Sequence, residues 1–260
     1  MAAKTKLGAL RALALTMSLG LLLASCSAAP KAGELPEGHA PLPSSSTSAP
    51  ATSTSPGDQA ELNVSQLAVA SGISMAVRLG FDKARVIESQ ELEALKQPPT
   101  DSLNGVVVIP SQCSEVIESL NWSPVQMGAE GARTDFLNEK IAATGSVEVA
   151  KITDKPVLEA HYATVLRMLT ECKKISMHVE TDVVPFTAQK PALKENQADS
   201  SILWTRANPG HPRRQQALVL VKTKGDYVAM VSFIAKDGLQ APEFTQMAAE
   251  ILNAALAQTR

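Results

Sequence analysis

Hydrophobic residues recur every three or four positions in two long segments of the chain, and this spacing predicts two amphipathic helices. The first helix lies within residues 152–174, where Asp154 can cap its start and Pro156 fits its first turn. The second helix lies within residues 242–258. The two apolar stripes consist of Leu158, Tyr162, Val165, Leu166, Leu169 and Cys172 in the first helix, and of Phe244, Met247, Ala248, Ile251, Leu252 and Ala255 in the second.

Two shorter segments carry a weaker form of the same pattern. Residues 110–120 predict a short helix with one apolar face, made of Cys113, Val116, Ile117 and Leu120. Residues 64–79 predict another helix, although Gly72 and β-branched residues lower its helix propensity. Its apolar face runs through Leu67, Ala70, Ile73 and Val77.

Strand patterns lie between these helices. Residues 105–109 form a short apolar run, and residues 145–152, 175–186 and 201–207 alternate between apolar and polar. The clearest hairpin is within residues 215–235, where Lys-Gly-Asp makes the turn and Val219 and Val221 face Val228, Met230 and Ser232. We therefore expect an α+β fold, a mostly antiparallel sheet with helices packed on one face.

The first 25 residues read as a secretory signal peptide. Lys4, Lys6 and Arg11 make a positive region, and an apolar region follows over residues 12–23. That apolar region is shorter than the roughly 20 residues that a membrane-spanning helix needs.

The residues before the expected cleavage point, Leu23-Ala24-Ser25-Cys26, resemble a bacterial lipobox. The resemblance implies that Cys26 becomes the first residue and carries acyl chains such as palmitate. Two or more such chains anchor a protein stably, at about 0.8 kcal/mol for each buried CH2 group. We therefore expect attachment to the outer face of the cell membrane, and the alternative is an ordinary signal peptide with a chance cysteine.

Residues 26–59 are rich in Pro, Ser, Thr and Ala. Such a composition cannot bury enough apolar surface to offset the entropy lost on ordering, so we interpret this stretch as a disordered tether. Residues 60–260 then form a single α+β domain.

The chain contains three cysteines, and an odd number in a secreted protein indicates a separate role for one of them. Lipidation of Cys26 leaves Cys113 and Cys172, which we expect to form a disulfide outside the cytoplasm. Two buried thiols are the alternative. The disulfide would join the helix of residues 110–120 to the end of the helix that begins near Asp154.

Charge and composition exclude some functions. The formal net charge is −2, and loss of the basic signal peptide makes the remainder more acidic, which argues against a nucleic-acid partner. Aromatic residues make up 3% of the chain, too few to favour stacking sites for sugars or single strands. The sequence lacks the common nucleophile, zinc-protease and nucleotide-binding motifs, so we expect no enzyme activity and no cofactor. Nothing in it requires more than a monomer.

Two groups of residues could still carry chemistry. Arg206, His211, Arg213 and Arg214 lie in or beside a Pro/Gly-rich loop and could hold a phosphate, a carboxylate or an anionic lipid head group. The alternative is an ordinary exposed loop between strands. His178, Glu180 and Asp182 could share one face of an alternating strand and bind a metal or transfer protons, although a solvated strand face explains them equally.

The order of elements carries a family resemblance. Pro110-x-x-Cys113 opens a helix, a strand follows, a helix ends at Cys172, and several strands precede a closing amphipathic helix. This order resembles actinobacterial lipoproteins with a PknH-like extracellular sensor domain and, more loosely, mycobacterial LpqN-type lipoproteins. The resemblance covers most of residues 60–258. It implies an antiparallel sheet with helices around a ligand cleft.

The chain departs from that family in two respects. The kinase sensor domains have two disulfides, whereas this chain can form one, and it has neither a kinase domain nor a transmembrane segment. Only Cys113 and Cys172 match, so no ligand-binding residue is carried over. We expect a membrane-anchored lipoprotein whose sensor-like domain binds a small molecule or a lipid, without catalysis. The alternatives are a cell-envelope assembly or protein-interaction module and, third, a hydrolase or metal-dependent enzyme.

Overall fold

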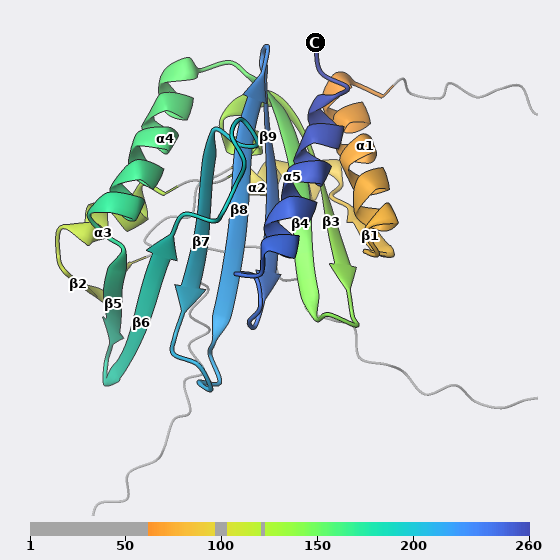
Figure 1. The fold of residues 1–260 in the computed structure, drawn as a ribbon. Coiled ribbons are helices and arrows are strands. Elements are labelled where there is room, and N and C mark those ends of the chain that lie inside the picture. The colour runs from red at the N-terminus through yellow and green to blue at the C-terminus, as the bar shows by residue number, and fades with distance from the viewer. Residues whose placement is uncertain (1–61, 97–102, 121–122) are drawn as a thin grey trace, which may run out of the picture. The chain divides into compact units, whose positions relative to one another are not determined.

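The computed structural model of the chain describes residues 62–96, 103–120 and 123–260 (Figure 1). The predicted signal peptide, the predicted lipobox with Cys26 and the predicted tether lie outside these residues. The described helices are α1 Val64–Arg78, α2 Ser89–Leu95, α3 Cys113–Glu118, α4 Lys155–Thr170 and α5 Pro242–Leu256, with a short 3-10 helix at Pro124–Gln126.

The described residues form a nine-stranded sheet in the order β1-β3-β4-β9-β8-β7-β6-β5-β2. Every pair of neighbouring strands is antiparallel, as the sequence predicts. The strands are β1 Lys83–Val86, β2 Val107–Ile109, β3 Gly128–Asn138, β4 Ala143–Ile152, β5 Lys174–Val179, β6 Asp182–Gln189, β7 Ser200–Arg206, β8 Gln215–Lys224 and β9 Tyr227–Ala235.

The two long predicted helices are confirmed. The carboxylate of Asp154 accepts a hydrogen bond from the Val157 amide at the start of α4, and Pro156 lies in the first turn. Pro242 opens α5, and the predicted stripe of α5 faces the core. The helix at 110–120 is shorter than predicted, because residues 110–112 form a turn before α3 begins.

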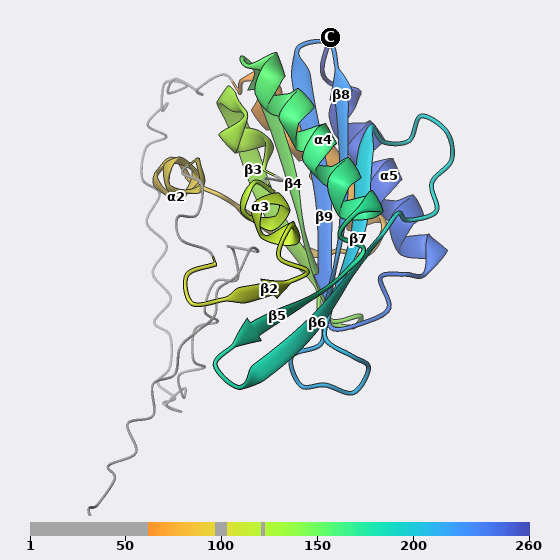
Figure 2. The same ribbon diagram turned by 90° about the vertical axis from the view of Figure 1, so that its left-hand side faces the viewer.

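Helices cover both faces of the sheet, so the expectation of a single covered face is wrong. Helices α1 and α5 pack together against β3, β4, β8 and β9, whereas α3 and α4 lie on the opposite side (Figure 1 and Figure 2). The reason lies in the central strands. Residues 217–221 of β8 are apolar and buried at every position, so both of their faces need a covering layer.

Helix α1 forms where predicted but is turned away from its predicted orientation. Leu67 and Val77 of the expected inner stripe are 46% and 49% exposed. The buried side instead carries small residues, Ser65, Ala68, Val69, Gly72 and Ala76. A Cβ atom on Gly72 would lie 3.1 Å from a methyl group of Val147 and 3.2 Å from the Cβ of Ala255. Close packing therefore selects the small face, although it is the less hydrophobic one.

The segment 175–186 is a hairpin and not one strand. Strand β5 ends at Val179 and β6 begins at its pairing partner Asp182, with Glu180 at a φ of +52° in the turn. A turn of two residues keeps the alternation in phase, so the pattern continues across the reversal. The predicted hairpin of β8 and β9 is confirmed, with Val219 opposite Ser232.

The disulfide between Cys113 and Cys172 is confirmed, with an S–S distance of 2.05 Å. It joins the first residue of α3 to the segment that follows α4. The residue after it, Lys173, is therefore held at a defined place beside the sheet. Its carbonyl accepts a hydrogen bond from the Ala188 amide of β6.

Candidate functional site

The predicted anion-binding loop connects β7 to β8. Arg214 donates from Nε and Nη2 to the carboxylate of Asp237, at 2.8 and 3.0 Å, and from Nη1 to the Ala207 carbonyl at 2.8 Å. This bidentate pair holds the pKa of Asp237 below its usual value, through the hydrogen bonds from Arg214. Arg214 is therefore engaged in closing its own loop.

The other residues of this loop are also engaged, with one exception. Arg213 forms an ion pair with Asp182 at 2.7 Å, and its backbone amide donates to Nδ1 of His211 at 3.0 Å. Arg206 has no carboxylate partner among the described residues, and its buried Nε has no hydrogen-bond partner there. Burial, together with the nearby charge of Arg213, lowers the pKa of Arg206. Anion binding by the four predicted residues stays a prediction. Of these four, Arg206 is the one whose side chain has no hydrogen-bond or ion-pair partner among the described residues.

The geometry expected for His178, Glu180 and Asp182 is wrong. Because the chain reverses at Glu180, the three residues occupy two strands and a turn. Nε2 of His178 lies 3.0 Å from the hydroxyl of Ser176, and Asp182 is paired with Arg213. Within the described ranges, no three His, Cys, Asp or Glu side chains are grouped to hold a metal ion.

A buried charge pair lies elsewhere on the sheet. Glu148 of β4 is fully buried and accepts hydrogen bonds from Arg133 at 2.7 Å and from the Ser123 hydroxyl at 2.6 Å. Burial raises the pKa of Glu148, and the charge of Arg133 opposes that rise. Both carboxylate oxygens of Glu148 accept hydrogen bonds. We therefore interpret the pair as a structural contact that connects β3, β4 and the segment at the 3-10 helix.

Apolar and polar side chains meet between α4 and the loop that joins β6 to β7, residues 190–199. A groove of about 730 Å³ runs between them. Its lining residues are Tyr162, Val165, Leu166, Leu169, Thr170, Lys173, Ala188, Gln189, Lys190, Leu193, Lys194, Glu195, Asn196, Ala198, Asp199, Ser200 and Ser201. We call it the α4 groove.

The α4 groove has one end that is closed by hydrogen bonds. Asp199 accepts from the backbone amide and the hydroxyl of Thr223, both at 2.7 Å, and from the Tyr162 hydroxyl at 3.4 Å. Burial, followed by the charge of Asp199, raises the pKa of Tyr162, so its phenol stays neutral. At the other end, the amide-to-carbonyl contact between Ala188 and Lys173 brings the start of the loop against the end of α4.

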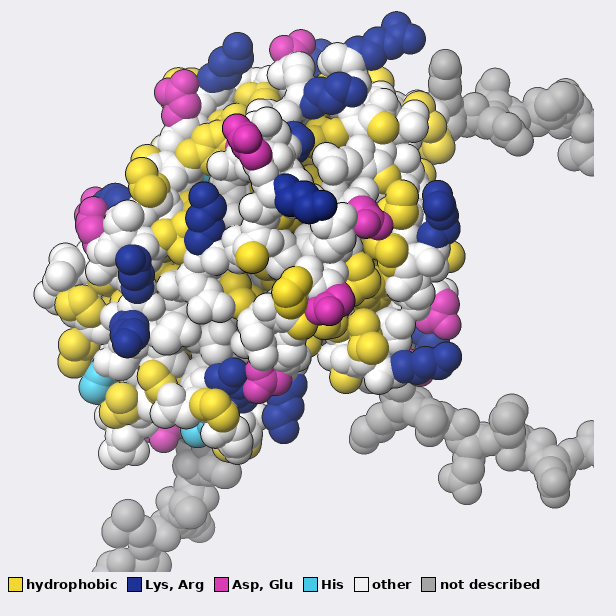
Figure 3. All heavy atoms as spheres, viewed as in Figure 1, with side chains coloured by type: hydrophobic (Ala, Val, Ile, Leu, Met, Phe, Trp, Pro, Cys, Tyr) yellow, Lys and Arg dark blue, Asp and Glu magenta, His cyan; other side chains and the backbone are white. Residues whose placement is uncertain are grey.

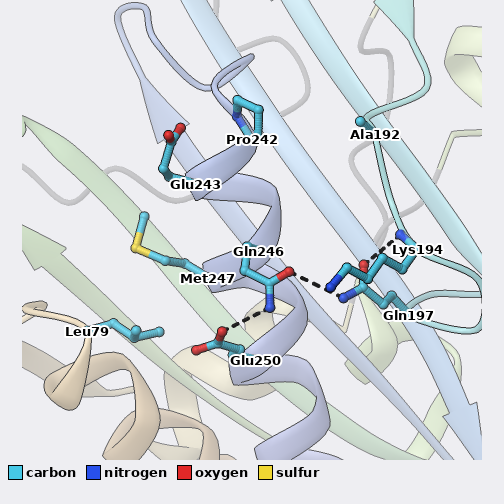
Figure 4. Close-up of a pocket in the computed structure, with 9 residues that line it drawn as sticks. All are labelled: Leu79, Ala192, Lys194, Gln197, Pro242, Glu243, Gln246, Met247 and Glu250. Atoms are coloured by element: carbon cyan, nitrogen blue, oxygen red, sulfur yellow. Dashed lines mark hydrogen bonds between the residues drawn. The ribbon is translucent and has the colours of Figure 1, made fainter.

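A second hollow, of about 480 Å³, lies on the other side of the same loop, against α5 (Figure 4). The amide of Lys194 donates to Gln197, Gln197 donates to Gln246, and Gln246 donates to Glu250 (Figure 4). These contacts fasten the loop to α5. Hydrogen bonds therefore fix the loop both toward α5 and toward the end of α4, and the α4 groove lies on the α4 side of the loop.

The face of the molecule toward α1 and α5 carries mixed charges (Figure 3). Basic and acidic side chains are scattered over it, and hydrophobic side chains reach the surface over β2, β5 and β6 at the lower left (Figure 3). The exposed apolar residues of those strands are Val107, Ile109 and Val183. Among the residues that the structure describes, no helix has the length and apolar character needed to cross a bilayer.

Solved structures that resemble this chain include two mycobacterial proteins. No family model and no curated protein matches the chain. An X-ray structure of an uncharacterized Rv0999 ortholog from Mycobacterium smegmatis aligns with a TM-score of 0.45 and 15% identity, over 73% of this chain and 95% of that one. The extracellular domain of PknH from Mycobacterium tuberculosis aligns with a TM-score of 0.36 and 13% identity, over 66% and 93%. PknH, to which the sequence was compared above, is thus among the structural matches, at a similarity that says nothing about function.

Little in the sequence indicates the α4 groove. Its outer wall, residues 190–199, lacks any apolar periodicity and reads as a connection between strands. The inner wall uses Tyr162, Leu166 and Leu169, which the helical stripe assigns to the core. The one available signal is a loop that carries Lys190 and Lys194 around a single large apolar residue, Leu193.

Proposed function

We propose that this chain is a lipid-anchored extracytoplasmic protein whose folded domain binds a small molecule in the α4 groove. The groove carries the proposal. Its volume of about 730 Å³ is within the range of about 300–1,000 Å³ that small-molecule sites occupy. Its walls combine aliphatic side chains with a few polar groups, as such sites do. The lipobox around Cys26 supports the anchoring, and the groove lies in the domain that the tether would present.

A first experiment tests the anchor. The Cys26→Ala variant of the full chain, expressed in an actinobacterial host, is expected to leave the membrane fraction, because the acyl chains have no other attachment residue in the lipobox. Wild-type chain from the same host is the control. Continued sedimentation of the variant with membranes would contradict lipid anchoring through Cys26.

A second experiment tests the groove. Native mass spectrometry of the Cys26→Ala chain is expected to show a small molecule that is released on denaturation. The same chain with Ala198→Trp, which places a large side chain in the groove, should carry none. Ala192→Trp is the matched control, because Ala192 lines the hollow on the other side of the same loop. Equal loading of all three chains would contradict binding in the groove.

The exposed sheet surface favours a second candidate, a protein-interaction module. Val107 lies opposite His178 on β5, and His178 lies opposite Val183 on β6, so the exposed valines flank His178 in one cross-strand row. Large apolar side chains gathered on adjacent strands mark a contact surface. If the purified chain carries no ligand, crosslinking from this surface at the cell envelope is the next measurement.

A further inference from the structure

The two ends of the α4 groove differ in charge. Lys173 follows the end of α4, and Lys190 lies two residues beyond Ala188, whose amide binds the Lys173 carbonyl. Both residues line the groove, and neither forms an ion pair with a carboxylate among the described residues. Lys194 and Glu195 of the loop line the groove as well. The carboxylate of Asp199 lies at the opposite end and is bound by Thr223 and Tyr162. The end of the groove at Lys173 and Lys190 is therefore basic, and no ion pair neutralises either lysine within the described residues.

The body of the groove is apolar. Leu166 is 62% exposed, although it belongs to the hydrophobic stripe of α4. Leu169 and Val165 line the same helix side, and Leu193 and Ala198 come from the loop opposite. A ligand with an aliphatic portion would remove the exposed surface of Leu166 from water, at a gain proportional to the area buried.

The groove is elongated along α4. Tyr162 and Thr170 both line it, and eight residues of helix at about 1.5 Å each correspond to about 12 Å. An extended chain fits a groove of this shape better than a compact ring does. The direction of the chain follows from the charges, since the anionic end would lie toward Lys173 and Lys190.

Ser200 lines the groove and carries a hydroxyl without a hydrogen-bond partner among the described residues. The hydroxyl of Ser200, at the start of β7, is buried and makes no hydrogen bond within the described part of the chain, and the residue is 7% exposed. A buried hydroxyl without a partner costs free energy, which an oxygen atom of a bound molecule would recover. An ester or hydroxyl oxygen along the chain of the ligand is suited to this position.

From these four observations we infer that the ligand of the α4 groove is an anionic amphiphile, a molecule with a phosphate or carboxylate head and an aliphatic chain. The inference rests on the proposed function and specifies its ligand class. The head is held by Lys173 and Lys190, the chain lies along Leu166, Leu169 and Leu193, and Ser200 binds an oxygen of the chain. Lysine suits this role because its ammonium group pairs with a phosphate or a carboxylate without a fixed geometry.

Calorimetric titration of the Cys26→Ala chain tests the inference. The probes are dodecyl phosphate, dodecanoate and the uncharged dodecyl maltoside, each below its critical micelle concentration, together with inorganic phosphate. We expect one dodecyl phosphate or dodecanoate per chain, with at least tenfold weaker binding of dodecyl maltoside and of inorganic phosphate. The double variant Lys173→Gln, Lys190→Gln should bind dodecyl phosphate at least tenfold more weakly. Its affinity for dodecyl maltoside should be unchanged.

The control is the double variant Lys140→Gln, Lys155→Gln. It removes the same charge from two exposed lysines outside the groove and should leave all four affinities unchanged. Ser200→Ala should weaken dodecyl phosphate less than the two lysine replacements do, because the donor that it removes is neutral. An unchanged affinity for dodecyl phosphate in the lysine variant would overturn the inference.

The outcomes distinguish this inference from the proposed function. If dodecyl maltoside binds as tightly as dodecyl phosphate and Ala198→Trp abolishes both, the groove binds ligands but the anionic class is wrong. If inorganic phosphate binds as tightly as dodecyl phosphate, the aliphatic part is wrong. If Ala198→Trp affects no probe, the groove is not the site, and the inference and the proposed function both fail.

Discussion

Two loops flank β7, and both are rich in cations, yet they differ in what those cations do. The loop after β7 carries Arg213 and Arg214, each of which is paired with a carboxylate of the same fold. The loop before β7 carries Lys190 and Lys194, and neither has such a partner among the described residues. A cation in a sequence is available to a ligand only when the fold has not already supplied its counter-ion.

The origin of the carboxylates explains the difference. Asp182 comes from the β5–β6 hairpin and Asp237 from the segment after β9, so both are distant in sequence from the arginines that they bind. Arginine with its planar fork favours such fixed pairs, whereas the lysine side chain is flexible and strongly hydrated. The arginine-rich loop is therefore closed by internal ion pairs, whereas Lys190 and Lys194 form no such pair among the described residues.

Removal of the disulfide should have the largest effect on this contrast. Cys113 and Cys172 enclose 59 residues, for which the chain-entropy account gives about 4 kcal/mol of stability. We expect the double variant Cys113→Ala, Cys172→Ala to lose about that much in urea unfolding. It should also bind dodecyl phosphate more weakly, since Lys173 follows the lost bond directly. Reduction of the wild-type disulfide is the control, and an unchanged unfolding midpoint would contradict the prediction.

A smaller effect should separate the two arginines of the β7–β8 loop. Arg214 has an 11% exposed side chain and makes three hydrogen bonds, so Arg214→Met should cost about 1–3 kcal/mol. The side chains of Arg213 and Asp182 are 48% and 52% exposed, and Arg213→Met should cost less than about 1 kcal/mol. Urea unfolding of the two variants measures the difference. Equal losses would show that burial does not distinguish the pairs.

The pH dependence provides a control on Arg214. Arg214 lowers the pKa of Asp237 below its ordinary 3.8, so the folded state favours the ionised carboxylate. The resulting stability is present above the ordinary pKa and is lost as the pH falls through the lowered one. The gap in stability between wild type and Asp237→Asn should therefore shrink below about pH 4. A gap that widened there would contradict the assigned direction.

How much of this could be predicted from the sequence depends on the range of the interactions. Helices α4 and α5, the β8–β9 hairpin and the disulfide follow from spacing and cysteine number. Strand β3 was missed because its charged residues Arg133 and Asp135 give it the composition of a loop. In the fold, Arg133 pairs with Glu148 on the neighbouring strand.

Less of the candidate site could be predicted from the sequence, for the same reason. The stripe of α4 indicates Leu166 as a core residue, because spacing cannot show that the loop opposite stands off and leaves a groove. Likewise, the four residues Arg206, His211, Arg213 and Arg214 form a basic cluster in the sequence. Only the fold shows that Asp182 and Asp237 reach it from elsewhere.

The variant with the smallest expected effect tests the difference between the two loops most directly. Asp182→Asn removes the partner of Arg213, and Arg213 lies close enough to Arg206 for its charge to lower the pKa of Arg206. Neither arginine would then have a carboxylate partner among the described residues, and the two could hold an anion together. We expect this variant to gain weak binding of inorganic phosphate, measured by chemical-shift changes near Arg206 and Arg213.

Asp182→Glu is the matched control for this prediction, because it keeps the negative charge and should gain nothing. The gain should also weaken as salt is added, since both guanidinium groups are partly exposed. If the Asp182→Asn variant gains no phosphate binding, the ion pairs within the fold are not what prevents the arginine-rich loop from binding an anion. The contrast with the lysine-containing loop would then have to come from the shape of the α4 groove, since the arginine-rich loop would have free cations and still bind nothing.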